Sequence, residues 1–368
     1  MKSKLFFLFL GIMMCCTSNA VAAKKILIGA DISALTLLEA QGVVYYENGK
    51  SKDLIAILKD NGFNAVRLRL FVNPKKDGIV DNDLAYTINL ARRAKAADMI
   101  FLLNFHYSDT WADPQQQIKP TAWNKMSFDE LKQTVHNYTA SVIAAFKKEN
   151  LLPDIVQIGN EITPGILWPD GSVSEANDTE IQWGKFTSLL KAGIAGVREA
   201  APDANIKIML HIDQGGKKSV SRWFFSNINK YHVSYDMIGV SYYPWWHGKI
   251  KNLKENLNYI ATELKKDVVV VETAYPHKEQ VNWHDHPPVG KMEFPLTPRG
   301  QYDMLSKVTK TILQVPDNRG TGAFYWFPES IPVAGKNNWL GGAAALFDHN
   351  GNALPGIHAF ADTVPIKR

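Results

Sequence analysis

The chain has 368 residues, of which 46% are hydrophobic and 21% charged, as is ordinary for a globular protein with a large core. Its 41 basic and 36 acidic residues give a net charge of +5, and the sequence contains no basic run with interleaved aromatic residues. Composition therefore argues against nucleic acid as a partner. The chain has ten tryptophans, a residue that often packs against sugar rings in binding sites but is also common in protein cores.

The first residues have the pattern of a signal peptide. Two lysines precede an apolar stretch at positions 5–14, and Ala20-Val21-Ala22 has the small residues of a cleavage site. The apolar stretch is too short to span a bilayer, so we expect no transmembrane segment. We expect export to the periplasm, the cell surface or the medium, with residues 1–23 removed. Lipid attachment at Cys15 or Cys16, both in the leader, is the less favoured alternative.

After the leader, strand-like and helix-like segments alternate without a linker or a change in composition. Eight βα units predict an α/β protein with a single (β/α)8 TIM barrel over residues 24–368. An open, doubly wound sheet is the alternative, but it usually has a glycine-rich turn after its first strand, which this chain lacks. The expected strands are Ile26–Ser33, Ala65–Leu70, Met99–Tyr107, Asp154–Glu161, Lys207–Asp213, Met237–Pro244, Val268–Tyr275 and Thr321–Pro328. The expected helices include Asp53–Asn61, Asp83–Ala97, Phe128–Lys148, Glu180–Ala200 and Gln301–Val315.

Two of the expected strands end in a glutamate. The apolar run Ile155–Ile158 leads to Asn160-Glu161, and the β-branched run Val268–Val271 leads to Glu272. A charge at the end of a buried strand is costly unless it is paired or hydrogen-bonded, and one such glutamate alone could cap a helix. In a TIM barrel, however, strands four and seven face each other across the mouth. Two carboxylates placed there are what a glycosidase uses to cleave a glycosidic bond.

The other strand ends supply hydrogen-bonding and aromatic groups. Strand one ends in Asp31, strand two carries Arg67 and Arg69, and strand five ends in His211 and Asp213. The arginines could instead form a structural ion pair with Asp31, the histidines could be core residues, and the tryptophans could simply close the barrel mouth. The predicted substrate-binding residues are Arg67, His106, Asp109, Trp111, Asp113, Asn160, Tyr243, Trp245, Trp246 and Trp326.

Four of these residues have specific expected roles. Arg67 and Tyr243 should lower the pKa of Glu272 and keep it ionised, whereas burial and the charge of Glu272 should keep Glu161 protonated. Asn160 should hydrogen-bond the sugar 2-hydroxyl, and Trp326 should form an apolar floor for the ring.

Longer motifs resemble glycoside hydrolase family 53, the arabinogalactan endo-β-1,4-galactanases. The resemblance covers essentially the whole mature chain, and the motifs that carry it are Gly29–Ser33, Arg67–Arg69, Phe105–Pro114, Gln157–Glu161, Ser241–Gly248, Glu272–Tyr275 and Leu346–Asp348. The resemblance implies a TIM barrel that hydrolyses β-1,4-galactan internally with retention of configuration. By position, Glu161 matches the acid/base and Glu272 the nucleophile. The resemblance also implies a cis peptide between Trp326 and Phe327.

Bacterial members of this family often hold calcium between the loops after strands seven and eight. Here the first loop contains His277, His284, Asp285 and His286, but the segment after strand eight, at 328–346, has no aspartate. Because calcium prefers several carboxylate and carbonyl oxygens, we expect no metal ligands and no required cofactor, and a structural calcium stays the less favoured alternative.

The expected partner is a polysaccharide, and we expect a monomer. Two alternatives stay open. One is another enzyme of the clan of retaining (β/α)8 glycosidases to which family 53 belongs, acting on mannan or glucan. The other is a non-catalytic glycan-binding barrel, against which the presence of both glutamates weighs.

Overall fold

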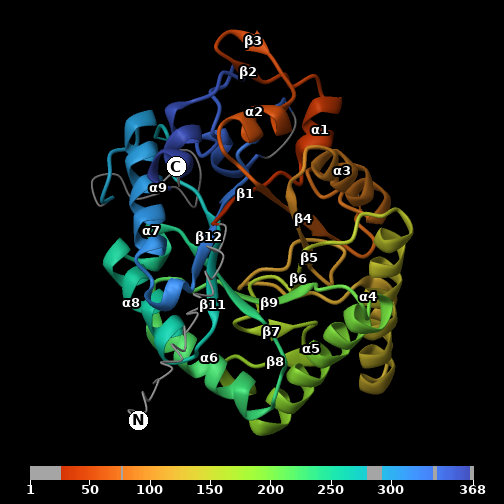
Figure 1. Cartoon of the computed structure of the whole chain (residues 1–368). Coiled ribbons are helices and arrows are strands. Elements are labelled where there is room, and N and C mark those ends of the chain that lie inside the picture. Colours follow the sequence, from red (N-terminus) through yellow and green to blue (C-terminus); the bar gives the residue numbers. More distant parts are fainter. Residues whose placement is uncertain (1–25, 76–77, 280–291, 335–337, 365–368) are drawn as a thin grey trace, which may run out of the picture.

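The structure is a computed structural model that describes residues 26–75, 78–279, 292–334 and 338–364. Its central feature is a closed barrel of parallel strands in the order β1-β12-β11-β10-β9-β6-β5-β4, which confirms the predicted (β/α)8 fold (Figure 1). Each expected strand is present, although most are shorter than predicted. The barrel strands are β1 (Leu27–Asp31), β4 (Ala65–Leu70), β5 (Ile100–Phe105), β6 (Ile155–Ile158), β9 (Lys207–Ile212), β10 (Met237–Tyr242), β11 (Asp267–Thr273) and β12 (Gly320–Trp326).

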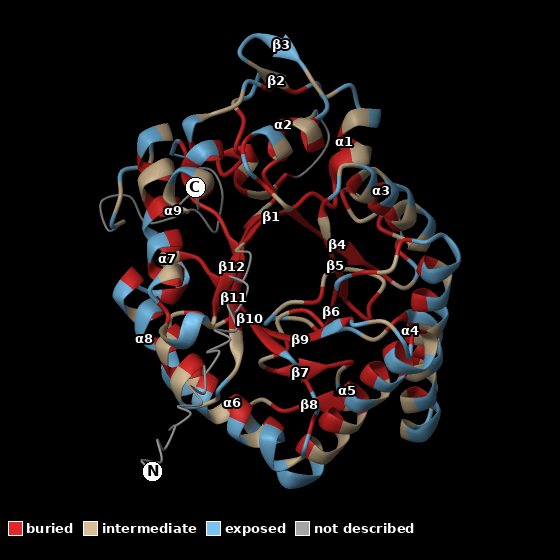
Figure 2. Ribbon diagram, in the orientation of Figure 1, coloured by how far each residue is buried: buried red, intermediate tan, exposed pale blue. Residues whose placement is uncertain are grey.

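Helices surround the barrel, with buried faces toward the strands and exposed faces outward (Figure 2). None of the helices in the described segments has the length and hydropathy needed to cross a membrane. The helices are α1 (Leu35–Ala40), α2 (Leu54–Asp60), α3 (Leu84–Ala96), α4 (Phe128–Lys148), α5 (Glu180–Ala200), α6 (Lys218–Lys230), α7 (Pro244–His247), α8 (Ile250–Thr262), α9 (Pro298–Leu313) and α10 (Ala359–Thr363). Two hairpins that were not predicted are β2 (Tyr46–Glu47) with β3 (Lys50–Ser51) and β7 (Gly165–Ile166) with β8 (Gly171–Ser172).

Side-chain caps determine where the long helices begin. Ser127 and Glu130 form a capping box at α4, in which each side chain bonds the backbone N–H of the other residue. Asp53, Asp83 and Thr179 cap α2, α3 and α5 through backbone N–H groups three residues later. These polar residues stand directly before apolar helical patterns, so the starts of the helices could be predicted from sequence.

The barrel interior is apolar at the amino ends of the strands and polar at their carboxyl ends. The apolar layer consists of Leu27, Ala65, Leu102, Ile155, Met209, Met237, Val269, Val271 and Phe324. Arg67, Asn104, Gln157 and His211 lie above it and are fully buried. Because buried polar groups are costly without partners, this second layer must be hydrogen-bonded, and its bonds position the candidate site.

A β-bulge turns Glu272 into the barrel. Val269 and Val271 both point inward, so strict alternation along β11 would direct Glu272 outward toward the helices. The register with β10 shifts at this point, from Val240 opposite Val270 to Ser241 opposite Glu272. A bulge of this kind re-aims side chains, and here it brings the carboxylate to the inner face.

A left-handed turn brings Glu161 to the same mouth. β6 ends at Ile158, after which Gly159 has φ 81° and Glu161 has φ 47°. A Cβ atom at Gly159 would lie 2.5 Å from Cγ2 of Ile162, so only glycine fits this turn. Glu161 is strained in this conformation, as functional residues often are.

Candidate active site

A pocket of about 530 Å³ opens at the carboxyl ends of the barrel strands. Its size is in the range of small-molecule sites, and it lies where TIM barrels have their active sites. The structure brings together at this pocket eight of the predicted site residues: Trp111, Asp113, Asn160, Glu161, Tyr243, Trp246, Glu272 and Trp326.

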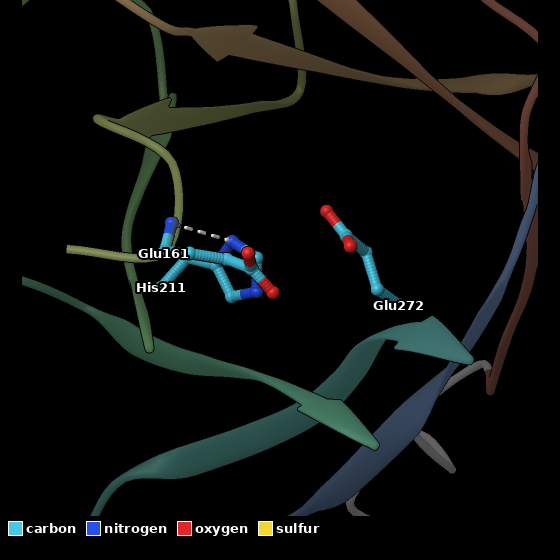
Figure 3. A group of neighbouring side chains, drawn as sticks. All are labelled: Glu161, His211 and Glu272. Carbon is cyan, nitrogen blue, oxygen red and sulfur yellow. Dashed lines mark hydrogen bonds between the residues drawn. The ribbon is translucent and has the colours of Figure 1, made fainter. Parts of the chain in front are cut away.

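The two glutamates approach each other from opposite sides of the mouth (Figure 3). Glu161 follows β6 and Glu272 belongs to β11, and His211 at the end of β9 lies beside Glu161. One carboxylate oxygen of each glutamate and one ring nitrogen of His211 all lie within 4.8 Å of one another. A sugar bound between these carboxylates would have one on either side of its reacting bond.

Glu272 is held by a cation and a hydroxyl. Arg67 Nη1 lies 2.7 Å from Glu272 Oε1, and the Tyr243 hydroxyl donates to Oε2 at 3.2 Å. The same guanidinium pairs with Asp31 at 3.0 Å and donates to Asn160 Oδ1 at 2.7 Å. Arg67 is fully buried, and a buried charge needs a partner. Carboxylates from two other strands, Asp31 and Glu272, compensate it.

The pKa of Glu272 is raised, contrary to the expectation that it would be lowered. Burial is the largest influence and outweighs the opposing effects of Arg67 and Tyr243, while Asp31 raises the pKa further. Sequence reasoning identified the correct partners but underestimated the desolvation of a carboxylate that is only 4% exposed.

Glu161 has no ion-pair partner within the part of the chain that the structure describes. Burial raises the pKa of Glu161 well above its usual range, and the charges of Glu272 and Asp213 add to this effect. Because Glu272 has Arg67 beside it and Glu161 has no comparable cation among the described residues, Glu161 is the carboxyl better suited to hold a proton. This arrangement agrees with the expected protonation of Glu161.

A hydrogen-bonded chain determines which oxygen of Glu161 carries that proton. His211 Nδ1 accepts from the backbone N–H of Glu161 at 3.3 Å, and burial lowers the pKa of His211 well below its usual range. The neutral ring therefore has its hydrogen on Nε2, which lies 2.9 Å from Ser241 Oγ. Ser241 in turn donates to Glu161 Oε1 at 2.6 Å, so the acidic proton is left to Oε2.

Glu161, His211 and Glu272 are also spaced as metal ligands could be. Their contacts fit proton transfer better, because both ring nitrogens of His211 have hydrogen-bond partners and Glu272 faces the Arg67 guanidinium. Of the loop after strand seven that was weighed as a calcium site and not favoured, His277 is described, whereas 284–286 lie outside the described residues.

Asn160 lies at the pocket wall with most of its amide engaged. Its Oδ1 accepts from Arg67 at 2.7 Å and from Asn104 at 3.1 Å, and its Nδ2 donates to the Ala112 carbonyl at 2.9 Å. A primary amide has two hydrogens, so Nδ2 can also donate to a sugar hydroxyl. Its predicted contact with the 2-hydroxyl stays a prediction.

Tryptophans form the walls of the pocket. The rings of Trp111 and Trp326 lie 6.0 Å apart, and the Arg69 guanidinium lies 4.5 Å from the Trp111 ring centre. Trp339 also lines the pocket but was not predicted, because no strand pattern marks the segment after β12. The high tryptophan content was the only signal that could have suggested it.

Four predicted residues do not line the pocket, and each acts on neighbouring groups instead. Arg67 lies beneath Glu272, and Trp245 packs behind Tyr243, with ring centres 5.4 Å apart. His106 Nδ1 accepts from the Ala112 N–H at 3.1 Å. Asp109 accepts from two backbone N–H groups of loops, at Asn73 and Thr121. Direct substrate contact by these four residues stays a prediction, and Nε1 of Trp245 and Nε2 of His106 have no hydrogen-bond partner among the described residues.

The predicted cis peptide between Trp326 and Phe327 is wrong. Within the described segments, the cis bond is at Trp168–Pro169. Phe327 instead has φ 64°, so a left-handed residue turns the chain at this point. Trp326 lines the pocket wall with a trans bond to Phe327.

Comparison with known proteins agrees with this geometry. The model of glycosyl hydrolase family 53 matches residues 27–360. An uncharacterized protein in the bgaB 5′ region of Niallia circulans is 42% identical, covering 90% of this chain and 93% of the relative. An arabinogalactan endo-β-1,4-galactanase of Humicola insolens is 36% identical, covering 90% of this chain and 98% of the relative. The family 53 catalytic domain of Ignisphaera aggregans superposes with a TM-score of 0.84 at 34% identity, covering 94% of this chain and 98% of that domain. The chain belongs to glycosyl hydrolase family 53.

Proposed function

We propose that this protein is an endo-β-1,4-galactanase that cleaves the galactan of type I arabinogalactan with retention of configuration. The observation that carries the proposal is the pair Glu161 and Glu272, which face each other with oxygens within 4.8 Å and have different surroundings. Retaining glycosidases separate their carboxyls by about 5–5.5 Å, whereas inverting enzymes leave about 6.5–9.5 Å for a water molecule. The short distance supports direct attack by one carboxylate.

The surroundings of the two carboxyls assign their roles. Glu272, beside Arg67, gives up its proton more readily and attacks the anomeric carbon. Glu161 transfers the proton on Oε2 to the leaving oxygen, so the glycosidic bond breaks as the ester to Glu272 forms. The ester removes the negative charge of Glu272, which lowers the pKa of Glu161 and keeps it ionised. Glu161 can then take a proton from the water that hydrolyses the ester.

The substrate proposal rests on family membership, on the names of the relatives and on the tryptophan-lined pocket. Activity should be measured on linear β-1,4-galactan, mannan, xylan and cellulose in parallel, with Glu272→Gln as the inactive control. We expect internal cleavage of galactan, so that viscosity falls before small products accumulate, and NMR should detect the β-anomer first. Equal rates on mannan would indicate a different enzyme of the clan. Binding without new reducing ends would indicate a carbohydrate-binding barrel, and an initial α-anomer would exclude retention.

We further propose that the protein is exported and that residues 1–23 are removed. The leader itself lies outside the described residues, so support comes from its sequence pattern. Amino-terminal sequencing and mass spectrometry of the protein recovered from the producing cells would test this proposal. A lipid at Cys15 or Cys16 would replace it with membrane anchoring.

A further inference from the structure

A second pocket opens beside the catalytic pocket, on the side of Glu161. It has a volume of about 320 Å³ and shares Pro114, Asp213 and Gln214 with the catalytic pocket, so the two pockets adjoin. The rest of its wall comes from the turns after β6 and β8 and from the region of α6, including Trp223. None of its described lining residues belongs to β11 or β12, the strands of Glu272 and Trp326.

The indole of Trp223 is held in place before any ligand binds. Its Nε1 donates to Asp178 Oδ2 at 3.0 Å, while Trp183 Nε1 donates to the other oxygen of the same carboxylate at 2.8 Å. The two rings meet edge to face, with centres 5.3 Å apart. Trp223 is partly exposed and lines the pocket, so it presents a fixed aromatic surface. Binding to such a surface loses little side-chain entropy.

The loop after β9 is also fixed, and it places polar groups beside this surface. A Cβ atom on Gly216 would lie 1.7 Å from the His247 carbonyl oxygen, so the loop packs closely against α7. The Asp213 carboxylate accepts a hydrogen bond from Thr163, two residues after Glu161. Lys217 is exposed at the pocket, where its ammonium group can donate to hydroxyls.

The position of the pocket relative to Glu161 determines which part of a galactan chain it can hold. Glu161 protonates the oxygen that leaves with the reducing-end segment, so sugars of that segment lie on its side of the mouth. We infer that the second pocket is a subsite for a galactosyl residue of the leaving segment. The indole of Trp223 packs against the C–H face of the ring, and Lys217 bonds its hydroxyls. This inference rests on the proposed galactanase function.

Two substrates separate this subsite from the catalytic centre. β-1,4-Galactohexaose can occupy both sides of the cleavage point, whereas an aryl β-1,4-galactobioside has no sugar in its leaving group. Trp223→Ala should lower kcat/KM on the hexaose roughly tenfold, the size of one aromatic contact, and leave the aryl substrate unaffected. Cleavage of hexaose labelled with oxygen-18 at the reducing end should also move toward that end.

Further variants guard against a folding defect. Val220→Arg should block the pocket without removing the packing of Trp223, and it should give the same substrate dependence. Arg222→Ala is the matched control, because Arg222 is exposed on the same helix but contacts the Tyr259 ring, outside the pocket. Equal losses of activity on both substrates would overturn the subsite. Full activity on the hexaose in folded Trp223→Ala and Val220→Arg proteins would also overturn it.

Calorimetry distinguishes failure of the subsite from failure of the proposed function. Hexaose binding to the Glu272→Gln protein should weaken roughly tenfold when Trp223→Ala is added. If the native protein cleaves neither substrate but this loss of binding is found, the galactanase proposal fails, and the second pocket stands only as a binding site for a galactosyl residue. If the native protein cleaves both and binding does not change, the subsite alone fails.

Discussion

Replacing Ser241 with alanine tests the proton order at Glu161. Ser241 is fully buried, donates to Glu161 Oε1 at 2.6 Å and lies 2.9 Å from His211 Nε2. This hydrogen bond lowers the pKa of Glu161 against the larger effect of burial, because it stabilises the ionised carboxylate. Its removal should therefore raise the pKa of Glu161 still further.

The size of the shift follows from the strength of the bond. A hydrogen bond to a charged group contributes about 1.5–3 kcal/mol, and about 1.4 kcal/mol corresponds to one pKa unit. Because Glu161 is partly exposed, water can replace part of the lost bond, so we expect a shift near the lower end, about one unit. Glu161 must be protonated to act as the acid, and activity is lost as pH rises through its pKa. The basic limb of the profile should therefore move about one pH unit upward.

The assay is the pH dependence of kcat/KM on a galactooligosaccharide, which reports the ionisations of the free enzyme. Ser306→Ala is the matched control, because Ser306 is also buried but lies on α9 and bonds the Ala359 carbonyl. A basic limb that moves downward would show that Glu161 donates to Ser241, the reverse of the proposed order. A basic limb that does not move would remove Ser241 from the proton chain altogether.

Three further predictions concern the carboxylates. Glu161→Ala should lower the rate on galactan by a factor of about 10²–10⁴, but azide should restore its turnover of an activated aryl galactoside and release the β-galactosyl azide. Glu272→Ala should be inactive, and formation of an α-galactosyl azide by Glu272→Ala would reverse the two roles. Arg67→Ala should lower the free energy of unfolding by about 3–5 kcal/mol, because Glu272 and Asp31 lose their buried cation. It should also move the acid limb of the kcat/KM profile to higher pH, and an unchanged acid limb would show that Arg67 does not influence the pKa of Glu272. Burial raises the pKa of Glu329 from 4.5 to about 8, so its contribution to stability is complete below pH 4.5 and is lost as pH rises through 8. The free energy of unfolding measured in urea should therefore fall between pH 4.5 and 8 for the native protein relative to Glu329→Gln, by up to about 1.4 kcal/mol per pH unit. Parallel pH profiles of the two proteins would contradict the raised pKa of Glu329.

The sequence predicted the barrel because its elements carry local signals. β-Branched runs mark the strands, and the bounds of Phe128–Lys148 and Glu180–Ala200 were predicted to the residue because capping residues precede amphipathic patterns. Two strands ending in glutamate were enough to suggest the candidate catalytic pair. The hairpins β2–β3 and β7–β8 were missed because strands of two residues have no periodicity.

What could not be predicted depends on contacts between distant parts of the chain. Alternation along Val268–Val271 cannot reveal the bulge that turns Glu272 inward, since the bulge is defined by pairing with β10. Ser241 looks like any small residue in a strand until His211 and Glu161 lie on either side of it. The direction of the Glu272 pKa shift likewise depends on how completely the side chain is buried, which residue identity does not give.

The difference between the two glutamates originates in one arginine. Arg67 bonds Asp31 on β1, Glu272 on β11 and Asn160 after β6, so a single guanidinium joins three strands at the level of the reaction. It offsets the burial of Glu272 directly but reaches Glu161 only through the neighbouring Asn160. One carboxyl is therefore suited to lose its proton and the other to keep it, although both are desolvated. Because the same contacts compensate buried charge, a change at Arg67 must alter stability and catalysis together, whereas a change at Ser241 can alter the proton chain alone.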